Sequence, residues 1–299
     1  MTWIIISILA AFAQTVRTSL QKQLKSSLSN AGITWVRFGF GLPFAVIYFL
    51  VLKYLGLEIP DINQPFIINS FLASICQIIG TFLLVSLFSY KNFAVSTLYA
   101  KTEVIQTAII GIIFFGEYLS IFGILAIMLG VFGIFIISLA EGKISFKMLL
   151  RSLSHKTAII GILSGTFFSL SALFIKNSSY HLGLETPFIS SSTTLLVMTI
   201  MQTIIMGIYL LSKERDQFAK MHKNLKTISL IGLTSIIGSI GWFTAFALTN
   251  VAYVKTVGQI ELLFSILITH KIFKEKFNRM EIIGGLLVIF SILILVVTI

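Results

Sequence analysis

Ten apolar runs, most of them about 20 residues long, are the feature that most constrains the fold of this chain. A helix needs about 20 mostly apolar residues to cross the hydrocarbon core of a bilayer. The length of the runs, and the absence of an alternating pattern within them, favour helices over a β-barrel. We therefore predict an all-α integral membrane protein with ten transmembrane helices, at residues 2–22, 31–52, 66–88, 93–115, 119–139, 157–177, 186–211, 227–248, 251–271 and 280–298.

Charge and cysteine content exclude several classes of protein. Only 11% of the residues are charged, against about 25% in an average soluble chain, too few to cover a soluble surface. The formal net charge is +11, but no basic stripe is interleaved with aromatic residues, which argues against nucleic-acid binding. The single cysteine, Cys76, excludes an intrachain disulfide, and four scattered histidines predict no metal site and no cofactor.

The distribution of basic residues predicts the orientation of the chain. Sixteen of the 22 Lys and Arg residues lie in connectors on one side of the predicted bundle, and two lie on the other. Because cytoplasmic loops carry the excess of positive charge, both termini are predicted outside the cytoplasm of a bacterial inner or plasma membrane. The run from Trp3 to Ala13 lacks a positive segment before it, so we predict a first helix there rather than a cleaved signal peptide.

An internal repeat relates the two halves of the chain. Glu103 recurs 158 residues later as Glu261, and Glu117 recurs as Glu275. Acids are rare within membrane spans, so two such pairs in one register are a strong signal. At the same offset, the further matches are Gly80 with Gly238, Phe88 with Phe246, Asn92 with Asn250, Ala94 with Ala252 and Phe115 with Phe273. A weaker match, with an offset near 154, aligns Lys22 with Lys176 in the first helix of each half.

The repeat predicts two domains, residues 1–140 and residues 155–299, each with five helices. Because five is an odd number, the second half enters the membrane from the opposite side. Such an inverted repeat is typical of secondary transporters, which bind their substrate near the membrane midplane between the halves. Two equivalent halves in opposite orientations can exchange conformations, which gives inward-open and outward-open states of similar energy.

Three short motifs resemble the EamA family of the drug/metabolite transporter superfamily, and the resemblance covers nearly the whole chain. They are Arg37-Phe38 at the start of the second span, the segment 94–98, and Phe115 to Leu119. The resemblance implies ten helices in two inverted repeats and transport of small polar metabolites, such as amino acids or nucleotide derivatives. It also implies cytoplasmic termini, against the charge count. One departure is the missing proline after Glu103 and after Glu261, where the family often has Glu-Pro.

The first two spans contain candidate substrate-binding residues. Gln14, Arg17, Thr18 and Gln21 recur at helical spacing and share one face, so we expect them to line a cavity. The alternative is a helix that ends near Val16. Arg37 lies in the first two turns of the second span, where its planar guanidinium suits a substrate carboxylate or phosphate; a headgroup anchor or a structural ion pair is the alternative.

The fourth and ninth spans carry charges near midspan, where ionised groups must be paired or hydrated. We expect the lysines to line the central cavity and bind an anionic group, and proton exchange by a glutamate is one open alternative. Helical spacing places each lysine and glutamate on different faces. The alternative is a structural role in which the glutamates tie helices together. The substrate-binding candidates here, with an aromatic residue of the eighth span, are Tyr99, Lys101, Glu103, Gln106, Trp242, Lys255, Gln259 and Glu261.

These features favour a secondary transporter of a small charged or zwitterionic metabolite, such as an amino acid, over other classes. A flippase, or flippase subunit, for a lipid-linked carrier is the main alternative. An enzyme is disfavoured because no catalytic constellation of His, Asp or Cys is present. The expected partners are the small-molecule substrate and the lipid bilayer, with no nucleic acid. Proton or ion coupling and a homodimer are left open.

Overall fold

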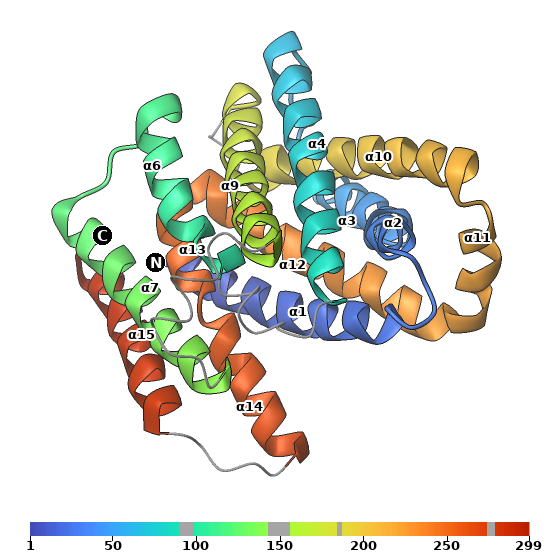
Figure 1. The fold of residues 1–299 in the computed structure, drawn as a ribbon. Helices are drawn as coiled ribbons and strands as arrows, with labels where there is room; N and C mark the ends of the chain where they lie inside the picture. The colour runs from blue at the N-terminus through green and yellow to red at the C-terminus, as the bar shows by residue number, and fades with distance from the viewer. Residues whose placement is uncertain (90–98, 143–155, 184–186, 274–278, 299) are drawn as a thin grey trace.

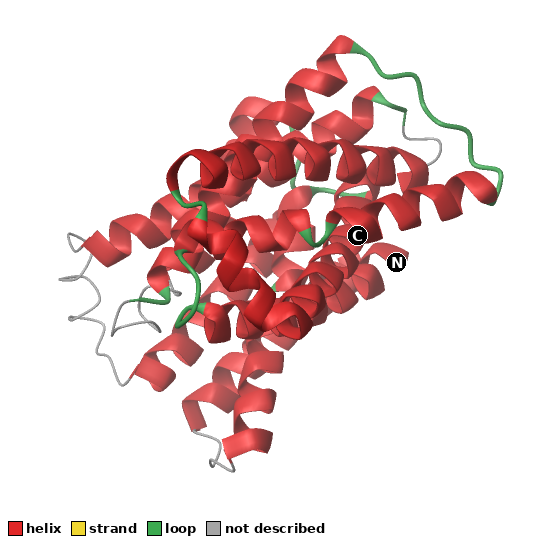
Figure 2. Ribbon diagram, turned by 90° about the vertical axis from the view of Figure 1, so that its right-hand side faces the viewer, coloured by secondary structure: helices red, strands yellow, loops and turns green. Residues whose placement is uncertain are grey.

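The computed structural model of the chain describes residues 1–89, 99–142, 156–183, 187–273 and 279–298. All regular secondary structure within these ranges is helical, as Figure 1 and Figure 2 show. The elements are α1 (Thr2–Leu24), α2 (Asn30–Gly39), α3 (Leu42–Tyr54), α4 (Gln64–Leu87), α6 (Glu103–Phe115), α7 (Ile121–Gly142), α9 (Lys156–His181), α10 (Pro187–Lys213), α11 (Asp216–Met221), the short 3-10 helix η1 (His222–Asn224), α12 (Leu225–Leu248), α13 (Val251–Gly258), α14 (Glu261–Phe273) and α15 (Arg279–Thr298).

Eight helical stretches in the described part of the chain are long and apolar enough to cross a membrane. They correspond to eight of the ten predicted spans, and two of them, 30–54 and 216–248, each combine more than one helix. The predicted span 93–115 lies partly outside the described residues. The predicted span 251–271 is divided between α13 and α14. The structure therefore supports a multi-pass helical membrane protein. The number of ten transmembrane helices stays a prediction.

Side chains of the bundle are arranged as expected for a protein with an apolar solvent. On α1, the outward residues Ile5, Leu9 and Phe12 are between 49% and 64% exposed. The inward face of the same helix carries small and polar residues, among them the buried Ala13 and Thr15. Apolar side chains are stable in contact with lipid on the outer face. Polar side chains need hydrogen-bond partners, which the interior of the bundle provides. This distribution is typical of helices packed in a bilayer.

The most extensive helix pairings join the two halves of the chain. α4 packs along α9, α1 packs along α12, and α7 packs along α15 (Figure 1). The first two pairings are equivalents, because each joins the third span of one half to the first span of the other. The third pairing joins the fifth spans of both halves. This reciprocity agrees with a two-fold relation between repeats.

Small residues let the paired helices approach closely. At the crossing of α7 and α15, a methyl group added to Gly133 would lie 2.7 Å from the carbonyl oxygen of Gly284. A methyl group on Gly284 would lie 2.6 Å from the carbonyl oxygen of Gly133. Between α9 and α4, Ser171 donates to the carbonyl oxygen of Ala73 at 3.1 Å. Close backbones and interhelical hydrogen bonds are the main forces that join helices in lipid.

Connectors gather at two ends of the molecule. At one end, the Ser29 hydroxyl bonds to Glu214, and Asn224 donates to the Ser27 hydroxyl at 3.4 Å. At the other end, Asn63 donates to the carbonyl oxygen of His181 at 2.7 Å. The two termini lie close together in both views (Figure 2). The segment 213–226 thus shares one end with the connector after α1, as alternating crossings of a membrane require.

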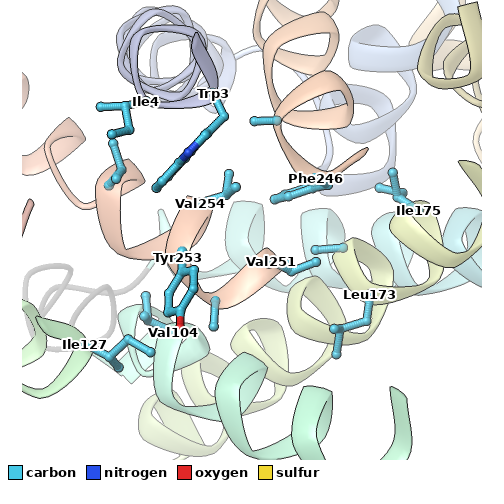
Figure 3. Packing of buried hydrophobic residues seen from close by; sticks show 14 of the residues in the cluster. Trp3, Ile4, Val104, Ile127, Leu173, Ile175, Phe246, Val251, Tyr253 and Val254 are labelled. Atoms are coloured by element: carbon cyan, nitrogen blue, oxygen red, sulfur yellow. The ribbon is translucent and has the colours of Figure 1, made fainter. Parts of the chain in front are cut away.

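Helix α13 lies at the centre of the main apolar cluster. Val251, Tyr253 and Val254 are buried there, and residues of α1, α6, α7, α9 and α12 surround them (Figure 3). The Tyr253 hydroxyl accepts a hydrogen bond from the Ser120 backbone N–H at 2.8 Å, which ties α13 to the start of α7. A short helix, held by both halves, therefore positions the residues that follow it.

Candidate functional site

The backbone is interrupted at equivalent points of the two halves. Thr102 is a turn residue immediately before α6, and Gln259 and Ile260 form a turn between α13 and α14. The Thr102 N–H bonds to the Tyr99 carbonyl three residues earlier, and the Ile260 N–H bonds to that of Val257. Each break is followed at once by a glutamate, Glu103 or Glu261, in the first turn of the next helix. Acids are stabilised there by the positive end of the helix dipole.

Two ion pairs connect the breaks across the halves. Lys101 of the first half pairs with Glu261 of the second, and the Lys255 ammonium lies 3.5 Å from the Glu103 carboxylate. The four side chains are only 12–16% exposed. Each half therefore supplies one cation and one anion, and each charge is neutralised by the opposite half.

Glu261 has further contacts from α1 and α12. Gln14 donates to its carboxylate at 2.5 Å, and Trp242 donates to the Gln14 side-chain oxygen at 3.1 Å. The Thr15 hydroxyl lies 3.4 Å from the Glu261 carbonyl oxygen. This chain of contacts orients the carboxylate, because Gln14 can satisfy both neighbours through its donor and its acceptor.

Aromatic rings surround the Lys255 ammonium. Its nitrogen lies 5.7 Å from the ring centre of Phe246, 5.9 Å from that of Trp242 and 6.0 Å from that of Phe168. The Trp242 and Phe246 rings are themselves stacked. Ring faces attract a cation when water is scarce. Lys255 thus contacts the Glu103 carboxylate and three aromatic rings. Lys101 instead pairs with Glu261, the glutamate that also accepts a hydrogen bond from Gln14.

The sequence-based prediction placed the lysine and the glutamate of each span on different helix faces. The prediction assumed continuous helices, in which Lys101 and Glu103 point in different directions. In the structure the helices are interrupted at Thr102 and at Gln259–Ile260, and Lys101 and Lys255 each pair with the glutamate of the other half. The ion pairs match the structural alternative, in which the glutamates tie helices together.

Three other candidates lie outside these ion pairs. The Gln106 amide accepts from the Thr166 hydroxyl at 2.7 Å and donates to that of Thr102 at 2.8 Å, which joins α6 to α9. Gln259 is buried against the crossing of α7 and α15, where its oxygen would lie 2.5 Å from a methyl group added to Gly130. Tyr99 is buried in the main apolar cluster.

The two candidate arginines are both buried. Arg17 is 3% exposed and Arg37 is 6% exposed. Arg37 donates to the Thr81 hydroxyl at 2.7 Å. Helix α1 continues to Leu24, so the alternative in which it ends near Val16 is wrong.

A third charged cluster has a structural role at the opposite end of the molecule from segment 213–226. Lys176 lies 2.6 Å from Glu117, whose carboxylate accepts from the Val251 N–H at 3.1 Å and so caps the start of α13. Asn250 donates to the Tyr118 carbonyl at 2.7 Å. Glu275, the repeat partner of Glu117, lies outside the described residues.

Sequence reasoning missed Phe168, although the repeat contained the signal that could have found it. At the offset of 154 that aligns Lys22 with Lys176, Phe168 corresponds to Gln14. The two residues occupy comparable places: Gln14 contacts Glu261, and Phe168 faces the lysine that pairs with Glu103. Among the described residues, no group of three or more His, Cys, Asp and Glu could hold a metal ion.

Comparison with known proteins concerns the fold and the family of the chain. A solved crystal structure, described only as "Crystal structure of protein", matches with a TM-score of 0.71 and 12% sequence identity, over 98% of each chain. At that identity the match speaks for the fold alone. No curated protein matches the chain. The model of the EamA-like transporter family matches twice, at residues 1–139 and at residues 155–297. These two matches include both breaks and all four charged residues of the reciprocal ion pairs, and the chain belongs to the EamA-like transporter family.

Proposed function

We propose that this protein is a secondary transporter that moves a small charged or zwitterionic metabolite by alternating access, with the substrate bound beside the two reciprocal ion pairs. The observation that carries the proposal is the exchange of counter-ions between halves, Lys101 with Glu261 and Lys255 with Glu103. Both pairs lie next to helix breaks, where transporters of this general design bind substrates.

The charge balance of the pairs suits a zwitterionic or ionic substrate. Without substrate, two cations and two anions neutralise each other. A substrate carboxylate can replace a glutamate as partner of Lys101 or Lys255, and a substrate ammonium can replace a lysine as partner of Glu103 or Glu261. A zwitterion that makes both replacements keeps every buried charge paired, which avoids the high cost of an uncompensated ion.

The reciprocal arrangement also supplies a physical basis for alternating access. The two pairs occupy equivalent places in the repeat, so weakening one and strengthening the other produces a state of comparable energy. If the halves are inverted, those two states open to opposite sides of the membrane. Protonation of Glu103 or Glu261 would release its lysine, and this is the route by which a proton gradient could drive the exchange.

The degree of burial favours a soluble substrate over a lipid-linked one. The charged side chains of both pairs lie within the bundle, bounded by Gln14, Trp242 and Phe168. A flippase for a lipid-linked carrier would need the headgroup to reach these charges through a lateral opening. The central position therefore supports transport of a soluble metabolite.

The test combines binding and transport. Purified protein is screened by thermal shift against a metabolite library, and hits are assayed for uptake into proteoliposomes. Lys101→Ala and Lys255→Ala should each weaken apparent affinity by about 1.5–3 kcal/mol, the value of a lost charge-assisted hydrogen bond. Lys53→Ala, at an exposed position, is the matched control. The proposal fails if hits bind but never accumulate across the membrane, or if both variants keep wild-type affinity.

A further inference from the structure

Several buried hydrogen-bond donors lie together without acceptors, one turn away from the reciprocal ion pairs. Within the described part of the chain, Arg17 Nε, Gln21 Nε2 and the Ser235 hydroxyl have no hydrogen-bond partner. Arg17 is 3% exposed, and Gln21 and Ser235 are each 1% exposed. A buried donor that lacks an acceptor costs about 1–3 kcal/mol, and more when it is charged. Three such groups in one region indicate that an acceptor belongs there.

Packing brings these groups to one place. Gln21 lies four residues after Arg17, on the same face of α1. Helix α12 runs along α1 with Gly241 against Ala10 and Gly238 against Ala13. Because residue numbers rise along α1 as they fall along α12, Ser235 lies at the level of Arg17.

Arg37 of α2 adds a second guanidinium to the group. A methyl group added to Gly41, one turn after Arg37, would lie 3.1 Å from the side chain of Ile236, the neighbour of Ser235. The Arg37 guanidinium donates a hydrogen bond to Thr81, a neutral partner. Among the described residues, no carboxylate forms an ion pair with either arginine. Two buried like charges with no counter-ion are unstable by themselves, so the arrangement calls for negative charge.

We infer that Arg17, Gln21, Arg37 and Ser235 form a subsite for an oxyanion, a carboxylate or phosphate group, carried by the transported substrate. Guanidinium groups bind both oxyanions through two parallel hydrogen bonds, and an amide and a hydroxyl supply further donors. The inference rests on the proposed transport function and narrows its substrate to organic anions and zwitterions with an oxyanion at one end.

The subsite is near enough to the ion pairs for one small molecule to reach both. Gln14, which bonds to Glu261, lies three residues before Arg17, about 4.5 Å along the helix axis. Glu261 in turn pairs with Lys101. The substrate's oxyanion is held by the arginines while the rest of the molecule extends to Glu261 and Lys101.

The direct test measures binding of inorganic phosphate, without any assumption about the natural substrate. Purified protein in detergent is titrated with sodium phosphate, and with sodium chloride at equal ionic strength, while thermal unfolding is followed. Phosphate, but not chloride, should raise the unfolding temperature. Arg17→Gln and Arg37→Gln should each raise the apparent dissociation constant for phosphate at least tenfold. Arg279→Gln, at an exposed site, should leave it unchanged.

A second readout separates binding from a structural role. Because each arginine is a buried cation without a counter-ion, Arg17→Gln should unfold at the wild-type temperature or higher when phosphate is absent. A fall in that temperature, or a phosphate response equal to wild type, contradicts the subsite. Phosphatidic acid, added in place of phosphate, tests a lipid headgroup as the source of the oxyanion. Stabilisation by this lipid alone contradicts a soluble substrate.

The result is distinguishable from a failure of the transport proposal. Phosphate binding that depends on both arginines, in a protein for which no substrate is taken up, supports the subsite and counts against transport. Uptake of a substrate whose affinity is unchanged in Arg17→Gln and Arg37→Gln supports transport and contradicts the subsite.

Discussion

Lys101 and Glu261 come from different halves of the chain, yet each is the other's counter-ion. The sequence-based analysis expected this lysine to line the central cavity and bind an anionic group. In the structure its partner is Glu261, which is mostly buried and would lose its cation if the lysine were removed. Gln14 would then remain its only recorded side-chain donor in the described part of the chain.

A pairwise substitution tests this coupling. Lys101→Met should lower the free energy of unfolding by roughly 3 kcal/mol, since a buried carboxylate loses its partner. The double variant Lys101→Met with Glu261→Gln should recover most of that loss, because both charges are gone. Thermal unfolding in detergent gives the comparison, and Lys53→Met serves as the exposed control. Equal stability of the single and double variants would show that the two residues are not coupled.

The charged residues of the candidate site could be predicted from the sequence. Charges within apolar runs are conspicuous, and the repeat selected Glu103 and Glu261 among the acids. The partners of those charges were not predictable, because each ion pair is a tertiary contact between residues of different halves. Phe168 was missed since one aromatic residue among 27 phenylalanines carries no signal without the repeat alignment.

At the level of helices, spans that are continuous in sequence can be broken in three dimensions. The Glu-Pro pair that is common in the resembled family is missing here, since no proline follows Glu103 or Glu261. The breaks occur nevertheless. At Thr102 and Ile260 the backbone N–H bonds to the carbonyl oxygen three residues earlier, in place of the one four residues earlier. Close tertiary packing accompanies the first break, where a methyl group on Gly165 would lie 2.9 Å from the Ala100 carbonyl oxygen. A helical wheel contains no information on such packing, so it could not predict either break.

The crossing of α7 and α15 depends on two glycines. Gly284→Ala should lower the free energy of unfolding by about 1–3 kcal/mol, the usual cost of overpacking, because the new methyl group would clash with the Gly133 carbonyl. Gly207→Ala is the matched control, since its recorded neighbour is a side-chain atom 3.3 Å away. Thermal unfolding of both variants provides the comparison. A stable Gly284→Ala protein would mean that the two helices separate easily.

At the scale of the whole molecule, the connectors between helices lie in two groups, one at each end of the bundle. The number and approximate position of eight spans followed from hydropathy, because the bilayer sets helix length. The pairing of helices did not follow, since lipid-facing and protein-facing apolar residues look alike in sequence. Orientation in the membrane stays a prediction from loop charge, which places segments 143–156 and 213–226 in the cytoplasm.

Cysteine labelling tests that orientation. In a Cys76→Ala background, a cysteine at Asn224 should resist an impermeant thiol reagent in intact cells and react after permeabilisation. A cysteine at Tyr54, which is 91% exposed and close to the connector at the opposite end, should react in intact cells. The reverse pattern would place the termini in the cytoplasm, as the family resemblance implies.

Dividing the chain tests the dependence of each half on the other. The extensive pairings α4–α9, α1–α12 and α7–α15 all cross between halves. Residues 1–142 and 156–299, expressed separately, should therefore be degraded or aggregate, and co-expression should restore a stable complex. Protease resistance and co-purification are the measurements. A half that is stable alone would contradict the prediction.

The reciprocal ion pairs have a consequence for biosynthesis. A ribosome completes the first half before the second exists, so Lys101 and Glu103 enter the bilayer while Glu261 and Lys255 have not yet been translated. Charged residues at the centre of a nascent span disfavour insertion by about 2.5–3.5 kcal/mol each for lysine or aspartate. During that interval the first half depends on the insertion machinery to shelter its charges. The first half therefore needs the insertion machinery until the second half is synthesised and supplies the counter-ions.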